Sequence, residues 1–178
     1  MKYIAFLRGI NVSGKNKIKM AELRQYLAEL DILNIQTYIQ SGNIIFESSE
    51  VNINILEQDI TDKIKEKFGF DVPTLVLTIE QLQKVVDNHP FAKDLENDKK
   101  FISVTFLAKT ATPENIEMLL ALNYPDEFIE LQGQVIYGFF PKGFGRAKLT
   151  NTRMERVLKV ACTTRNWRTC NKVLEIAN

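Results

Sequence analysis

Residues 40–46, Gln-Ser-Gly-Asn-Ile-Ile-Phe, are typical of a β-hairpin turn that leads into a buried strand. Glycine and asparagine tolerate the positive φ angles of such turns, and the apolar run that follows fits a strand. A similar stretch, Leu-Gln-Gly-Gln-Val-Ile-Tyr, occupies residues 131–137 and aligns Gly133 with Gly42. The two stretches therefore indicate two related hairpins and an internal duplication of the chain.

The first hairpin lies within a regular order of predicted elements. Apolar residues spaced like one face of a helix predict helices around Leu23–Leu30 and over Ile53–Phe68, where Gly69 is a fitting stop. Strands are predicted at Lys2–Arg8, Ile35–Gln40, Ile44–Glu47 and Pro73–Leu77. The resulting βαββαβ order is that of a ferredoxin-like unit.

The same order of elements recurs in the second half. A capping box at Thr78–Gln81 opens a connecting helix to about Val86, and the polar segment Asp87–Lys100 is the best linker candidate. The predicted elements that follow are a strand at Phe101–Leu107, a helix after Thr112-Pro113, a hairpin at Phe128–Phe139, a helix at Met154–Ala161, an extended piece at Cys162–Thr164 and a last helix to Ala177. We therefore predict an α+β fold of two packed ferredoxin-like halves, residues 1–90 and 91–178.

The composition fits one compact globular domain or two small ones. Of the 178 residues, 45% are hydrophobic and 25% are charged, which is enough apolar material for a core. No apolar run approaches the roughly 20 residues that span a bilayer, so no membrane partner is expected. The apolar part of the N-terminus is too short for a signal peptide. We expect a cytoplasmic protein, and the oligomeric state stays open.

The cysteines and the histidine argue against a metal centre and against a nucleophilic triad. Cys162 and Cys170 match no zinc-binding spacing, and His89 is the only histidine. A disulfide is disfavoured in a reducing compartment, and no paired carboxylates in a polar segment suggest acid–base catalysis. We expect no metal and no cofactor, a buried Cys170 on a helix stripe, and His89 in a loop. Whether the protein is an enzyme stays open.

Basic side chains gather near the two ends of the chain. Residues 1–25 hold six Lys and Arg side chains against Glu22, and residues 142–172 hold nine against Glu155. The segment between them is acidic, so the net charge of the whole chain is only +1. Such an asymmetry can build a face that attracts anions, or it can reflect solvated helix faces that happen to be basic.

The segment Gly9–Asn16, Gly-Ile-Asn-Val-Ser-Gly-Lys-Asn, nearly matches a phosphate-binding P-loop that follows a strand. Asn16 replaces the Ser or Thr of that pattern, and no later strand ends in the Asp of its metal site, so nucleotide hydrolysis of that type is disfavoured. The loop, with Lys15, Lys17 and the helix start after it, can still hold an anion through N–H groups and positive charge. The alternative is a surface loop whose glycines only form a turn.

Three polar signatures, Leu7–Val12, Thr37–Asn43 and Thr164–Thr169, lie at the edges of apolar runs. The third offers a guanidinium, an amide and an aromatic ring at 165–167, which suit a phosphate, a carboxylate or a nucleobase. Its alternative is structural, with Trp167 in the core and the preceding asparagine as a helix cap, and turn chemistry is the alternative for the hairpin residues. The predicted ligand-binding residues are Arg8, Asn11, Lys15, Lys17, Gln40, Asn43, Lys148, Arg165 and Asn166.

Together the three signatures resemble those of the bacterial domain-of-unknown-function family 1697, from Lys2 nearly to the C-terminus. The resemblance implies two ferredoxin-like halves and no established activity. Two positions depart from the family pattern, because Ser13 stands where glycine is usual and Ala147 where serine is usual. The first departure argues against strict dependence on a backbone nest, and the second argues against a role for a hydroxyl there, while Lys148 remains available.

These observations favour a module that binds a phosphate-bearing small ligand or nucleotide through a basic site formed by both ends of the chain. Such a site requires Arg8–Lys17, Thr164–Trp167 and Lys148 on one side of the molecule, since charges in solvent are screened beyond about 8 Å. Arg165→Ala should then weaken anion binding and leave the fold largely intact. Nucleic acid is the less favoured partner, because a dense aromatic RNA-binding signature is absent and the pI of about 7.7 is low. The alternatives are a small enzyme acting on a phosphorylated substrate and an interaction module without a small ligand.

Overall fold

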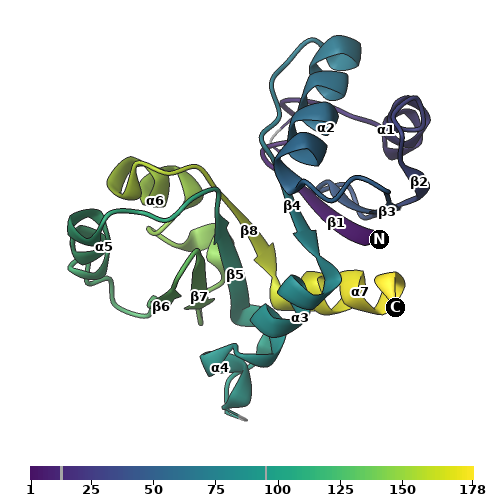
Figure 1. Cartoon of the computed structure of the whole chain (residues 1–178). Helices are drawn as coiled ribbons and strands as arrows, with labels where there is room; N and C mark the ends of the chain where they lie inside the picture. The colour runs from purple at the N-terminus through teal and green to yellow at the C-terminus, as the bar shows by residue number, and fades with distance from the viewer. Residues whose placement is uncertain (13, 95) are drawn as a thin grey trace. The chain divides into compact units, whose positions relative to one another are not determined.

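The computed structural model describes residues 1–12, 14–94 and 96–178 (Figure 1). The chain divides into two compact units, of which the first holds Met1–Gln83 with Lys172–Asn178 and the second holds Lys84–Asn171. Each unit contains one four-stranded antiparallel sheet. The predicted α+β class with two sheet-bearing halves is therefore confirmed. The predicted domains, residues 1–90 and 91–178, stay a prediction.

The sheet of the first unit has the strand order β2-β3-β1-β4. Alternate residues of a strand share a face, and Tyr3, Ala5 and Leu7 of β1 point into the buried core beneath the two helices. Figure 1 shows both helices, α1 and α2, on the same side of this sheet. The elements of the unit are β1 (Lys2–Leu7), α1 (Met20–Leu27), β2 (Leu33–Tyr38), β3 (Asn43–Glu47), α2 (Ile53–Phe68) and β4 (Thr74–Thr78).

Local sequence signals set both ends of α2. The Asn52 side chain accepts a hydrogen bond from the Asn54 N–H at 3.1 Å, which satisfies one of the free donors at the helix start. Gly69 ends the helix in the left-handed conformation, with φ of 79°, and its N–H donates to the Lys65 carbonyl. The helix predicted from the apolar spacing, including its glycine stop, is confirmed.

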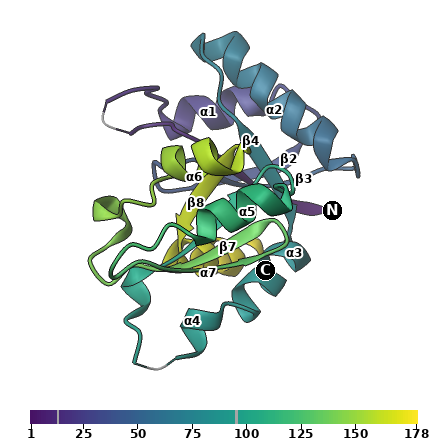
Figure 2. The same ribbon diagram turned by 90° about the vertical axis from the view of Figure 1, so that its left-hand side faces the viewer.

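The sheet of the second unit has the order β6-β7-β5-β8, which is the order of the first sheet when strands are counted from each unit's start. Helices α5 and α6 cover one face and lie in front of the strands in Figure 2. The two predicted hairpins join β2 to β3 and β6 to β7. The elements are β5 (Ile102–Leu107), α5 (Pro113–Leu120), β6 (Phe128–Gln132), β7 (Val135–Phe139), α6 (Asn151–Leu158) and β8 (Cys162–Asn166).

Two connecting helices, α3 (Ile79–Asp87) and α7 (Trp167–Ala177), complete the larger elements. The predicted capping box opens α3, because the Gln81 N–H donates to Thr78 Oγ1 at 3.2 Å and the Thr78 N–H donates to Gln81 Oε1 at 2.8 Å. The predicted linker at 87–100 contains helical turns instead of being irregular throughout. The short helical segments of the chain are α4 (Pro90–Lys93), η1 (Lys99–Phe101) and η2 (Phe144–Arg146).

The helices of the described ranges include none that is both long enough and apolar enough to cross a bilayer.

Candidate functional site

The loop that follows β1 folds back on itself before α1 begins. The Asn11 N–H donates to the Asn16 carbonyl at 3.1 Å, and the Asn16 side-chain amide donates to the Gly9 carbonyl at 3.1 Å. Gly9, Asn11 and Asn16 all have positive φ angles, which glycine and asparagine adopt most readily. Residues 9–12 and 14–16 of the segment predicted to resemble a P-loop are therefore held together by backbone and side-chain hydrogen bonds. Ser13, which departs from the family's usual glycine, lies outside the described residues.

Asn11 fastens this loop to the β2–β3 hairpin. Its Nδ2 donates to the carbonyls of Ile18 at 2.9 Å and Gln40 at 2.8 Å, and its Oδ1 accepts from the Ile18 N–H at 2.9 Å. The Leu7 N–H also donates to the Gly42 carbonyl at 2.8 Å. The first two polar signatures therefore meet at one end of the sheet. Both amide donors of Asn11 are engaged, so Asn11 builds the site instead of presenting an amide to a ligand.

A shallow depression lies beside this junction, between the loop, the start of α1 and the hairpin turn. It brings together Asn11, Lys17 and Gln40, three of the residues predicted to bind a ligand. The helix start was expected to help hold an anion, but its individual lining residues, Met20, Ala21 and Glu22, were not among the predicted ones. The lining residues are Asn11, Gly14, Lys17, Ile18, Lys19, Met20, Ala21, Glu22 and Gln40.

The start of α1 adds partial positive charge to the depression. The first N–H groups of a helix have no intrahelical partners, and the side chain of the N-cap residue, Lys19, makes no capping bond. Lys19 Nζ instead contacts Glu22 Oε1 at 3.0 Å. Lys17 is exposed, and its ammonium has no hydrogen-bond or ion-pair partner in the part of the chain that the structure describes. Lys17 is therefore the cation of this depression that is available to a ligand.

The other residues predicted in the first unit do not line the depression. Lys15 is exposed on the same loop, and Arg8 is partly buried just after β1. Asn43 is fully buried, and its Nδ2 donates to the Tyr38 carbonyl at 2.9 Å and to Ser41 Oγ at 3.0 Å. A buried amide with both donors engaged stabilises the hairpin, which favours turn chemistry over ligand binding for Asn43.

In the second unit, the predicted residues Lys148 and Asn166 are exposed and have local structural contacts. The Lys148 ammonium lies 5.5 Å from the ring centre of Tyr124, and the Lys148 N–H donates to Glu127 Oε1 at 2.6 Å. Asn166 Oδ1 accepts from the Arg168 N–H at 2.9 Å, which is the capping role given above as its alternative. No contact in the described residues joins Lys148 to Asn166 in one cluster.

Arg165 differs most from its expected place. Because β8 extends to residue 166, Arg165 pairs with Val104 inside the sheet, and only 7% of it is exposed. Its Nη1 donates to Thr163 Oγ1 at 2.9 Å and to the Thr164 carbonyl at 3.0 Å. Burial lowers the pKa of the guanidinium to about 10. Because this pKa is still well above 7, Arg165 carries its positive charge at neutral pH. The expectation that Arg165→Ala leaves the fold intact is therefore corrected, since the side chain is part of the interior.

His89 stands in the connection between α3 and α4, as expected, and it is fully buried there. Its Nε2 lies 3.0 Å from the Ser103 carbonyl, and its ring packs edge-on against Tyr137 at 4.8 Å and Trp167 at 5.0 Å between centres. Trp167 is half-buried, so it anchors the start of α7 without being wholly interior. Burial lowers the pKa of the imidazole, while the Ser103 carbonyl and then Glu130 oppose this shift more weakly.

This histidine predicts a pH dependence of stability. Its folded pKa lies below the ordinary value of about 6.5, so unfolding takes up a proton when the pH is below that value. We expect the free energy of unfolding to be highest above about pH 6.5 and to fall by up to about 1.4 kcal/mol per pH unit as the pH drops towards the folded pKa. Urea denaturation between pH 7.5 and 5 measures this slope.

His89→Gln is the matched control for that measurement, because a neutral amide can donate to the Ser103 carbonyl but does not titrate. Since His89 is the only histidine, the variant should lose the slope between pH 6.5 and 5, even if it is less stable at every pH. An unchanged slope in the variant would contradict the assignment to His89.

No group of three or more His, Cys, Asp and Glu side chains within residues 1–12, 14–94 and 96–178 is arranged to hold a metal ion. The segments Arg8–Lys17 and Thr164–Trp167 belong to different units, and the expectation that they meet stays a prediction.

Comparison with known proteins gives a family and a fold. A family model described as "Protein of unknown function (DUF1697)" matches residues 1–137. The solved structure of a conserved bacterial protein, SP0830 from Streptococcus pneumoniae, is similar with 25% sequence identity and a TM-score of 0.66, over 99% of this chain and 98% of that chain. No curated protein matches the chain. The structural likeness extends over nearly the whole chain and indicates a shared fold.

Proposed function

The chain belongs to the DUF1697 family, whose description assigns no function, and we propose from its own geometry that it binds a small phosphate-bearing ligand or nucleotide in its first unit. The proposed site is the depression between the loop after β1, the start of α1 and the turn around Gln40. The observation that carries the proposal is that Lys17, without a partner among the described residues, stands beside the N-terminal end of α1, where the N-cap residue Lys19 makes no side-chain capping bond.

The chemistry of the depression suits a compact anion. Helix N–H groups donate to phosphate oxygens, and the partial positive charge of the helix end favours a negative ligand. Lys17 adds a full positive charge, while the Lys19–Glu22 pair is close to neutral as a whole. Gln40 lines the other side and offers an amide for the non-phosphate part of a ligand. Asn11 supports this arrangement by holding the loop to the hairpin.

A small anion fits this site better than RNA does. Single-stranded RNA is typically held by aromatic rings on which bases stack, together with a basic groove that follows several phosphates. The lining of this depression contains no aromatic residue, and it presents one unpartnered lysine in the described part of the chain. The proposal is therefore a binding function for a single phosphate group or a short nucleotide.

Lys17→Ala tests this function directly. We expect the affinity for inorganic phosphate or a nucleoside monophosphate, measured by calorimetry, to fall at least about tenfold, since a charge-assisted contact contributes about 1.5–3 kcal/mol. The matched control is Lys65→Ala, because Lys65 is another exposed lysine of the first unit, and its ammonium pairs with the exposed Asp71 at 3.0 Å. Its removal should leave the affinity unchanged.

Glu22→Gln provides a change of the opposite sign. The carboxylate of Glu22 lines the depression and repels an anion, so its neutralisation should raise the affinity for phosphate. Equal losses in Lys17→Ala and Lys65→Ala, or no gain in Glu22→Gln, would place the anion elsewhere.

We also propose that the two units are ferredoxin-like halves related by internal duplication. Support comes from their identical strand order, with the edge-to-edge series 2-3-1-4 in each, and from hairpins at corresponding places. Superposing β1–β4 on β5–β8 in an experimental structure tests this relation. Gly42 and Gly133 should then coincide, and a register offset of the two hairpins would argue for independent origins.

A further inference from the structure

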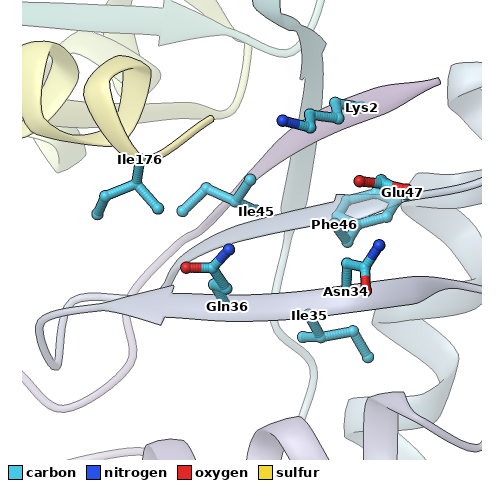
Figure 3. Close-up of a pocket in the computed structure, with 8 residues that line it drawn as sticks. All are labelled: Lys2, Asn34, Ile35, Gln36, Ile45, Phe46, Glu47 and Ile176. Atoms are coloured by element: carbon cyan, nitrogen blue, oxygen red, sulfur yellow. The ribbon is translucent and has the colours of Figure 1, made fainter. Parts of the chain in front are cut away.

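A second hollow, of about 370 Å³, lies in the first unit on the sheet face opposite α1 and α2 (Figure 3). Its floor is apolar and consists of Ile45 of β3 and Ile176 of α7. Ile176 belongs to the C-terminal segment Lys172–Asn178, which groups with the first unit. Its volume falls in the range of roughly 300–1,000 Å³ that is typical of small-molecule sites. The residues that line it are Lys2, Asn34, Ile35, Gln36, Ile45, Phe46, Glu47 and Ile176.

A β-bulge places two amide side chains at this hollow. Leu33 pairs with Glu47 and Gln36 pairs with Ile45, so Asn34 and Ile35 together lie opposite one residue of β3. Asn34 has φ of 54°, a conformation that costs energy for a residue with a side chain and that recurs where a backbone positions functional groups. Figure 3 shows the Asn34 and Gln36 side chains on the side of the hollow and Ile35 on the other side of β2.

Charges of both signs stand at neighbouring positions of the hollow. Lys2 and Glu47 are directly opposite each other on β1 and β3, and yet they form no ion pair in the described structure. Lys2 Nζ instead donates to the Ala177 carbonyl at 2.8 Å, which leaves two of its three N–H donors for other groups. The half-buried Glu47 carboxylate has no hydrogen-bond or ion-pair partner within the described residues.

We propose that this hollow binds a small zwitterionic ligand, an α-amino acid with an apolar side chain. The ligand ammonium would sit on Glu47, and its carboxylate would accept from Lys2, because both ligand charges lie on one carbon and both protein charges lie on adjacent strands. The apolar side chain would cover Ile45 and Ile176, and the Asn34 and Gln36 amides would complete the polar contacts. This site shares no lining residue with the anion site proposed above, so each of the two proposals can be tested independently of the other.

The test is a titration of the full-length ¹⁵N-labelled protein with L-leucine, followed by NMR. We expect saturable shifts in the amide signals of residues 34–36 and 45–47. Isopentylamine and 4-methylpentanoate, which each carry only one of the two charges, should bind at least fivefold more weakly than leucine. Absence of saturable shifts in these segments with leucine, or equal binding of the three compounds, would overturn the proposal.

Two variants separate ligand contacts from the fold. Glu47→Gln should weaken leucine binding about tenfold or more, whereas Asp62→Asn, a neutralisation of an exposed carboxylate on α2, should leave it unchanged. Asn34→Gly keeps the bulge, since glycine adopts positive φ freely, and removes only the amide, so it should weaken binding without loss of stability. Wild-type affinity in Glu47→Gln would contradict the assignment of the ammonium to this carboxylate.

Discussion

Replacing Gly42 with alanine is expected to lower the free energy of unfolding by about 2–4 kcal/mol, through strain and overpacking together. Gly42 has φ of 75°, and a Cβ atom built there would lie 2.6 Å from Leu7 Cβ and 2.8 Å from Ile10 Cδ1. The isoleucine methyl can move, but Leu7 Cβ is fixed to the backbone of the central strand β1. The close approach of hairpin and strand, which also brings Asn11 to the Gln40 carbonyl, therefore depends on glycine.

Gly9→Ala is the matched control for that prediction. Gly9 has φ of 72°, and a Cβ atom there would meet nothing within 4 Å. It should therefore lose only about 1–2 kcal/mol from the backbone conformation itself. Urea denaturation of both variants gives the comparison. Equal losses of unfolding free energy in the two variants would mean that the close approach of Gly42 to Leu7 does not contribute to the effect.

Arg165→Ala is expected to lower the free energy of unfolding by about 2–5 kcal/mol, because it removes a large buried side chain and its hydrogen bonds. The guanidinium donates to Thr163 Oγ1 and to the Thr164 carbonyl, and both acceptors lose these bonds in the variant. Arg168→Ala is the control. Arg168 is exposed three residues further along, so its loss should change stability by no more than about 0.5 kcal/mol.

Arg165→Met separates packing from charge. Methionine fills much of the same volume without a buried charge, and such replacements are often close to neutral. We expect its melting temperature to lie well above that of Arg165→Ala. If Arg165→Ala and Arg168→Ala were equally stable, the buried placement of Arg165 in β8 would be contradicted.

Sequence signals that extend over only a few neighbouring residues predicted much of the fold. The turn residues at Gly42 and Gly133, the capping box at Thr78–Gln81 and the glycine stop at Gly69 each act through the local backbone, so the sequence alone indicates them. The apolar spacing of α2 likewise reflects burial of one helix face. Local chemistry and the final structure agree at these positions.

Burial that depends on distant segments was not predictable in the same way. Arg165 does precede a helix, as the sequence indicated, but pairing with β5 extends β8 past Arg165 and buries its side chain. His89 stands between polar residues in sequence, and rings from Tyr137 and Trp167 enclose it only in the folded unit. Both cases depend on contacts made far along the chain, which no local pattern records.

The candidate site was predictable in part for the same reason. The lysines and the near P-loop pattern indicated the segment after β1, and Lys17 and Gln40 do line one depression there. The role of Asn11 was not predictable, because its bonds join residues 11, 18 and 40 and depend on the folded loop. The bulge at Asn34 was not predictable either, because it is defined by the pairing of β2 with β3.

The most direct test of the proposed function is an NMR titration of the ¹⁵N-labelled protein with inorganic phosphate at constant ionic strength and pH. The largest saturable shifts are expected in the amides of residues 14–22 and at Gln40, and the Lys17→Ala protein should need at least about tenfold more phosphate for the same shifts. Shifts confined to residues around Lys148 and Arg168, or an identical titration of the Lys17→Ala protein, would contradict the proposed function.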